Sequence, residues 1–176
     1  MPDFYPHNFI QNCRDENNEY IEFVKLYSFK STKSNLRYLV RVEKYRHKVY
    51  VIKFYLKNNR HSREKYNLLT NTFEPRRIIY TCINILKEIF FDDPESSFAF
   101  IATNSPDEEV SNTKRYRVYK TIVNTQFGID TFDHFYYQDK SAYLLLRKSE
   151  LKKNPGLLDK IEREFSIIYD LSERNL

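Results

Sequence analysis

LRYLVRVEKYRHKVYVIKFYL, residues 36–56, is the stretch that decides the fold. In its first half Tyr38, Val40 and Val42 stand at alternate positions, and the second half has the same two-residue period. Strand side chains point alternately to the two faces of a sheet, so this period predicts two strands. Because few residues separate them, we expect the strands to pair as a hairpin around Tyr45–His47.

Outward from this hairpin, the periodicity predicts further strands and helices. The expected strands cover residues 20–29, 66–70 and 97–103, and the expected helices cover 76–91, 112–123 and 155–171. FDHFYY and SAYLLLR, on either side of Gln138–Lys140, are expected to form a closing hairpin. This order predicts an α+β fold, a mostly antiparallel twisted sheet covered by helices.

The chain is expected to form one domain over residues 1–176, since 176 residues are too few for two full-sized domains. Within it we distinguish a basic hairpin part at 20–65, a helix–strand–helix–hairpin part at 66–150, and the C-terminal helix. The wide apolar arc of the 76–91 helix predicts that it packs against the sheet. The core is then expected to include Ile79, Ile83, Leu86, Phe98, Phe100 and Leu145.

Composition excludes several common classes of protein. Gly128 and Gly156 are the only glycines, so phosphate-binding loops built on several glycines are excluded. Cys13 and Cys82 form no disulfide framework, and no Cys/His spacing is typical of a metal site, so no metal is expected. No apolar run is long enough for a membrane span, and MPDFYPHNF at the start does not resemble a signal peptide. A cytoplasmic protein is therefore expected.

Positive charge is concentrated in one part of the chain. Residues 30–65 hold twelve basic and two acidic residues, a formal charge of +10, whereas the whole chain carries +5. Such a segment attracts an anionic partner, either nucleic acid or an acidic protein. Alternatively, the cations merely keep a sheet face soluble and protect its edge. The candidate binding residues are Arg37, Arg41, Lys44, Arg46 and Lys48.

Arg115 is a second candidate, because on a helical wheel it falls inside the apolar arc of the 112–123 helix. Lys114, Arg117 and Lys120 fall outside that arc. An arginine on a core-facing side needs acceptors, since an unpaired buried charge is costly. We weigh three roles for Arg115: reaching solvent at the helix end, an ion pair with Asp107 or Glu108, and ligand binding.

The arrangement from Tyr66 to Arg147 resembles the central and C-terminal parts of the GNAT acetyltransferase superfamily. In that family a short helix often carries Asn, then Ala three residues on, then an apolar residue and Tyr at six and seven. Asn112, Val118 and Tyr119 match this pattern, and Arg115 departs from it. The same segment also resembles small uncharacterised bacterial domains, and this second resemblance implies no activity.

The GNAT resemblance implies binding of acetyl-CoA at a glycine-containing turn before the long helix, where this chain has Thr72–Arg77, TFEPRR. The turn has no glycine, Pro75 removes one N–H, and Glu74 would repel phosphate. We therefore expect no cofactor. If the family's chemistry were retained, Arg76 and Arg77 would attract the phosphates, Asn112 would match the motif, and Tyr119 would protonate the leaving thiolate.

Three functions follow as expectations. The first is a non-catalytic, GNAT-like binding module that contacts an anionic partner through the basic hairpin. The second is an acyl-CoA-dependent N-acyltransferase with a divergent cofactor turn. The third is a structural or assembly subunit. The histidines are scattered, and no hydrolase motif is present, so the residues themselves favour a protein that is not an enzyme.

Overall fold

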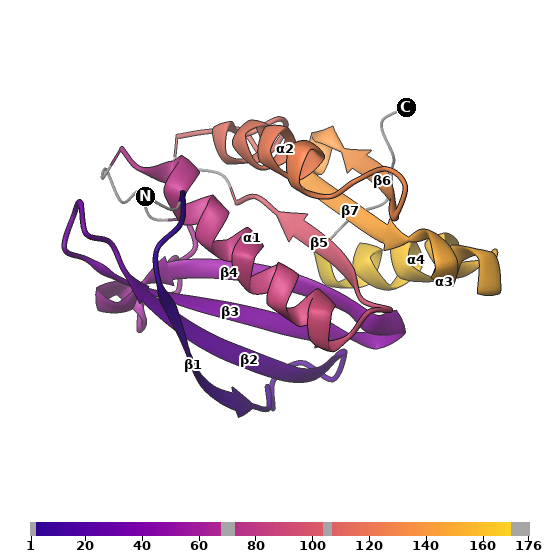
Figure 1. Ribbon diagram of the computed structural model, residues 1–176, viewed down its shortest axis with the longest axis horizontal. Coiled ribbons are helices and arrows are strands. Elements are labelled where there is room, and N and C mark those ends of the chain that lie inside the picture. Colours follow the sequence, from indigo (N-terminus) through magenta and orange to yellow (C-terminus); the bar gives the residue numbers. More distant parts are fainter. Residues whose placement is uncertain (1–2, 68–72, 104–106, 170–176) are drawn as a thin grey trace.

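The computed structural model describes residues 3–67, 73–103 and 107–169. Its strands form one seven-stranded sheet with the order β1-β2-β3-β4-β5-β7-β6 (Figure 1). All neighbouring pairs are antiparallel except β4 and β5, which are parallel. The expected α+β class with a mostly antiparallel sheet is therefore confirmed. The strands are β1 (His7–Cys13), β2 (Ile21–Lys30), β3 (Arg37–Tyr45), β4 (Val49–Leu56), β5 (Ser97–Ile101), β6 (Phe132–Tyr137) and β7 (Ala142–Arg147).

The hairpin expected from residues 36–56 is confirmed. Strand β3 pairs with β4 from Tyr38 opposite Leu56 to Tyr45 opposite Val49. A short turn, Arg46–Lys48, joins the two strands, and His47 adopts a left-handed conformation with φ 60°. The closing hairpin is confirmed as well, with β6 and β7 joined by Gln138–Lys140.

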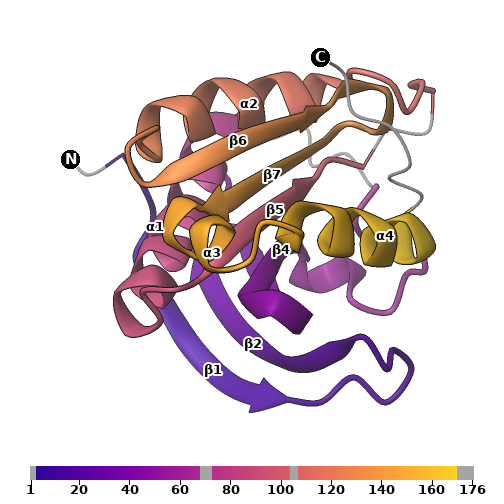
Figure 2. The ribbon, with the colours of Figure 1, turned by 90° about the vertical axis from the view of Figure 1, so that its right-hand side faces the viewer.

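Helices cover both faces of the sheet. One face carries α1 (Pro75–Asp92) and α2 (Lys114–Gln126), and α4 (Leu157–Tyr169) packs on the other. In Figure 2, α4 lies in front of β4 and β5, with α1 behind the sheet. The sheet therefore separates two apolar cores, one centred on the isoleucines of α1 and the other on Ile161 and Phe165 of α4.

Helix α1 begins and ends where its sequence predicts. Pro75 stands at the first helical position, where the missing N–H costs no hydrogen bond, and Asp93-Pro94 follows the last turn. The expected core is confirmed, because every one of its members is at most 3% exposed. These members are Ile79, Ile83, Leu86, Phe98, Phe100 and Leu145.

Three elements differ from the expectation. Strand β1 was not predicted, because it is an exposed edge strand and its sequence HNFIQNC lacks apolar alternation. The short helix α3 (Lys148–Lys153) was also not predicted. Of the strand expected at 66–70, Tyr66 and Asn67 lie in a turn, and the remainder lies outside the described residues. Strand β4 is instead the parallel neighbour of β5.

Candidate functional site

The parallel strands β4 and β5 diverge part of the way along their length. Their pairing ends at Ile52 opposite Phe100, although β4 continues to Leu56. A cavity of about 160 Å³ lies at this divergence. Its lining comes from β4, from the segment after β5, from α2 and from the end of α4, and includes Lys53, Thr103, Tyr119 and Tyr169.

Arg115 spans the opening between the diverging strands. Its guanidinium donates hydrogen bonds to the carbonyl oxygen of Tyr66 and to the hydroxyl of Thr103, the latter at 2.8 Å. Thr103 Oγ1 in turn donates to the Tyr66 carbonyl at 2.7 Å. The guanidinium thus ties the segment after β4 to the segment after β5, which gives Arg115 a positioning role at the strand divergence.

Tyr119 packs beside this opening, with its ring 6.2 Å from that of Phe100. Burial raises the pKa of its phenol, and the nearby Arg115 only partly opposes this shift. A phenol with a raised pKa stays protonated at neutral pH, but it is a weaker proton donor than an ordinary tyrosine. Asn112, the other matched position of the GNAT pattern, precedes α2 in a left-handed conformation, and its carbonyl accepts a hydrogen bond from Arg117 at 2.5 Å.

A larger groove lies between the start of α1 and the outer face of α2. Its volume is about 570 Å³, within the range of small-molecule sites. Arg76, Lys114 and Arg117 line it, and no carboxylate of the described residues does. The rest of its lining is apolar or carries hydroxyl groups: Pro75, Tyr80, Val118, Thr121, Ile122 and Thr125.

A third space of about 150 Å³ lies between the groove and the cavity at the strand divergence. This space shares Pro75, Lys114 and Val118 with the groove. With the cavity at the strand divergence it shares Phe54, Arg115 and Tyr119. The three spaces therefore lie in a row from the cationic groove towards the middle of the sheet, and we call this row of mainly apolar spaces the path.

Further cations lie at the start of α1. A hollow of about 350 Å³ shares Arg76 and Tyr80 with the groove and adds Lys33 and Arg77. The guanidinium carbon of Arg77 lies 4.1 Å from the centre of the Tyr5 ring, and its buried Nε has no hydrogen-bond partner among the described residues. The first amides of a helix are also unpaired within the helix and favour an anion.

Glu74 is less of an obstacle to an anion here than its sequence position suggests. Its carboxylate is buried and accepts hydrogen bonds from Ser31 at 2.7 Å, from Ser34 at 2.9 Å and from the hydroxyl of Tyr5. It lines the hollow at the start of α1 but not the groove between the helices. Glu74 would therefore not contact an anion held in the groove.

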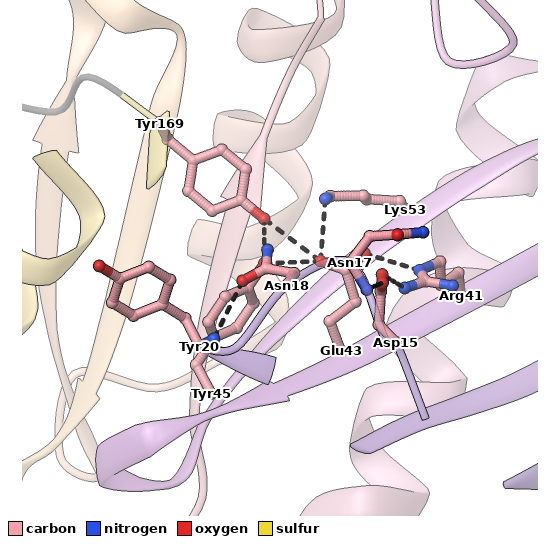
Figure 3. A network of polar contacts seen from close by, with 9 residues as sticks. All are labelled: Asp15, Asn17, Asn18, Tyr20, Arg41, Glu43, Tyr45, Lys53 and Tyr169. Atoms are coloured by element: carbon pink, nitrogen blue, oxygen red, sulfur yellow. Dashed lines mark hydrogen bonds and ion pairs between the residues drawn. The ribbon is translucent and has the colours of Figure 1, made fainter. Parts of the chain in front are cut away.

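On the opposite side of the strand divergence, a network of charged and phenolic groups surrounds Glu43 (Figure 3). The Glu43 carboxylate accepts hydrogen bonds from Arg41 at 2.7 Å and from Tyr45 at 2.8 Å. Lys53 Nζ lies 2.8 Å from it, and the Tyr169 hydroxyl lies 3.2 Å from it. Burial alone would raise the pKa of Glu43, but Lys53, Arg41 and Tyr45 more than offset this, so the pKa is lowered.

This network leaves Glu43 poorly suited to act as a general base. A carboxylate with a lowered pKa binds protons weakly, and its oxygens are already occupied by cations and phenols. Lys53, whose ammonium lies 5.0 Å from the centre of the Tyr169 ring, lines the cavity on this side. The arrangement holds β3, β4 and α4 together.

The five candidate residues of the basic hairpin do not gather on one surface. Arg41 points to the α4 face, where it pairs with Glu43 and Asp15. Lys44 points to the α1 face, 3.8 Å from Glu22 and 4.0 Å from Asp93.

Lys48 pairs with Glu95, while Arg37 and Arg46 are exposed. The structure thus neutralises three of the five cations with carboxylates from other parts of the chain. Alternation along a strand explains the split between the faces, because neighbouring side chains point in opposite directions.

Within the described residues, no group of three or more His, Cys, Asp and Glu side chains is placed to hold a metal ion. The same part of the chain has no helix long and apolar enough to cross a membrane. Comparison with protein-family models, with curated proteins and with solved structures gives no significant match. The class of this protein therefore rests on its α+β fold and on the site just described.

Proposed function

We propose that this chain is a non-catalytic, GNAT-like binding module that holds an anionic small molecule with an apolar arm in the groove between α1 and α2. The observation that carries the proposal is the convergence of Arg76, Lys114 and Arg117 on a groove whose described lining has no carboxylate. Converging cations repel one another, so an anion placed between them is stabilised. The proposed anion-binding site is therefore the groove between α1 and α2, and not the basic hairpin that the sequence suggested.

The apolar arm is supported by the path that leads away from the cations. Val118 lies in the wall of both the groove and the connecting space, and Phe54 and Tyr119 continue that wall towards the strand divergence. A ligand with phosphate or carboxylate at one end and an extended, less polar chain would match both parts. Acyl-CoA is one compound class with these properties.

A non-catalytic role is supported by the far end of the path. There Lys53 lines the cavity and is paired with Glu43, whose lowered pKa makes it a weak base. The N-acyltransferase alternative draws its support from a different observation, the divergence of β4 from β5 with Tyr119 beside it. Both functions use the same groove, and they differ in whether the ligand is turned over.

Isothermal titration calorimetry with coenzyme A, acetyl-CoA and decanoate tests the binding function. We expect saturable binding of at least one of the three. Arg76→Gln and Arg117→Gln should each weaken it about tenfold, the usual loss for one charge-assisted contact. Lys152→Gln is the matched control, because Lys152 is exposed on α3 and does not line the groove.

Absence of saturable binding by all three compounds, or binding that is unchanged in both arginine variants, would contradict the proposed function. A thiol-release assay with acetyl-CoA and simple primary amines then separates the two candidates. We expect no release above the uncatalysed rate. Release that is lost in Tyr119→Phe would favour the acyltransferase instead.

A further inference from the structure

A second cationic hollow lies on the opposite face of the sheet, between the β3–β4 turn and α4. It has a volume of about 250 Å³. Arg46 and His47 line it from the turn, and Lys160 and Arg163 line it from α4. Residues three or four apart lie on the same side of a helix, so α4 presents both cations to the turn.

The three permanent cations of this hollow have no carboxylate partner among the described residues, whereas Arg41, Lys44, Lys48 and Lys53 of the hairpin each have one. Arg46, Lys160 and Arg163 make no ion pair within the part of the chain that the structure describes. Arg41 and Lys48, on the same hairpin, each have one. The charge of Arg46 is therefore combined with that of two cations on a helix more than 100 residues away in the sequence.

The hollow carries net positive charge even when its one carboxylate is included. Glu164 also lines it, leaving three permanent cations against one anion. One carboxylate oxygen of Glu164 is buried without a hydrogen-bond partner in the described residues. Close like charges repel, and a bound anion would relieve that repulsion.

The kind of anion follows from the donors and from the shape. Arg46 and Arg163 have planar guanidinium groups, which bind the oxygens of a phosphate in pairs. At about 250 Å³ the hollow is smaller than the groove between α1 and α2, and it is too small to follow a nucleic-acid backbone over several nucleotides. Tyr20 and Ile167 at its margin, the latter 69% exposed, supply apolar contact for an organic substituent.

We infer that this hollow binds the phosphate group of a small organic phosphate monoester, with Arg46, Lys160 and Arg163 as its ligands. The inference is independent of the groove between α1 and α2, because the two sites share no residue and lie on opposite faces of the sheet. Either site would retain its ligand if the other proved empty.

To test this, the full chain is titrated at low salt with phenyl phosphate and, separately, with inorganic phosphate. Binding is monitored by NMR chemical shifts or by calorimetry. We expect saturable binding of phenyl phosphate that is weakened about tenfold or more in Arg46→Gln and in Arg163→Gln. Lys48→Gln is the matched control in the same turn, since Lys48 is paired with Glu95 and lies outside the hollow. Arg76→Gln controls for the groove, and both controls should leave phenyl phosphate binding unchanged.

No saturable binding of either phosphate, or equal binding by wild type and both arginine variants, would overturn the inference. The inference would also be overturned if phenyl phosphate did not bind and an acidic peptide or a single-stranded oligonucleotide bound in a manner that depends on Arg46 and Arg163. Thermal unfolding of each variant checks that it is folded. Because Arg46 and Arg163 are both exposed, the folded state is expected to be retained.

Discussion

The ammonium group of Lys53 lies 2.8 Å from a carboxylate oxygen of Glu43, and the two residues belong to neighbouring strands. The Glu43 side chain is 4% exposed and that of Lys53 is 21% exposed. Tyr45 donates to the same carboxylate, and its hydroxyl lies 2.5 Å from that of Tyr169. The ion pair of Lys53 with Glu43, together with the Tyr45–Tyr169 contact, therefore connects the centre of the sheet to the last described turn of α4.

Replacing Lys53 with methionine should destabilise the protein by about 2 kcal/mol. Removal of one partner of a fully buried pair costs about 3–5 kcal/mol, but Lys53 is partly exposed and Arg41 still compensates Glu43. Urea unfolding of Lys53→Met, Glu43→Gln and the double variant measures the coupling. We expect the double variant to be more stable than the sum of the two single losses predicts, and strict additivity would contradict this coupling.

The stability contributed by Glu43 should depend on pH in a defined direction. Its pKa is lowered in the folded protein from the ordinary value of 4.5, so the unfolded chain binds a proton more readily. The contribution is therefore fully present above about pH 4.5 and is lost as the pH falls through the folded-state pKa. The difference in unfolding free energy between wild type and Glu43→Gln should shrink between pH 6 and pH 3, roughly the range in which carboxylates titrate. A difference that grows on acidification would contradict the proposed ion pairing.

Arg41 and Arg37 lie on one strand and provide a matched comparison. Arg41→Gln should cost about 2 kcal/mol, because it removes charge-assisted hydrogen bonds to Glu43 and Asp15. Arg37→Gln should change stability by less than about 0.5 kcal/mol, because Arg37 is exposed. Thermal unfolding of the two variants measures this. Equal losses would show that Arg41 does not depend on these partners.

The core under α1 gives a further comparison. Leu86 is 0% exposed in the core that α1 shares with the sheet, so Leu86→Ala should cost about 2–5 kcal/mol. Phe91, in the same helix, is 85% exposed, and Phe91→Ala should leave the free energy of unfolding almost unchanged. Chemical denaturation compares both with wild type. A small loss for Leu86→Ala would mean that this face of α1 is not packed on the sheet.

Local periodicity was enough to predict most elements of this fold. The hairpin of β3 and β4 and helix α1 each place their apolar residues with the period of their element, and the hairpin of β6 and β7 is indicated by two aromatic and apolar runs on either side of Gln138–Lys140. Strand β1 has no such period, because an exposed edge strand buries neither face. Its place in the sheet comes from hydrogen bonds to β2, and these depend on residues that are distant in sequence.

The candidate sites were only partly accessible to sequence reasoning. Arg76 and Tyr119 were named through the GNAT resemblance, and the groove and its connecting path include them. Lys114 and Arg117 were placed on the outer side of their helix, but nothing local indicates that α1 faces them there. Arg41 was named as an anion ligand, whereas Glu43 and Asp15 occupy its donors. A charge count along the chain cannot identify such partners.

The sequence by itself therefore determined the α+β class, the hairpin and the buried face of α1, because these depend on the spacing of apolar residues over a few turns or strands. Only the tertiary structure decided which charges remain available to a ligand. Electrostatic interactions depend on distance in space and not on distance along the chain. Folding places Lys160 and Arg163 beside Arg46, whereas it places Glu95 beside Lys48, two residues away from Arg46.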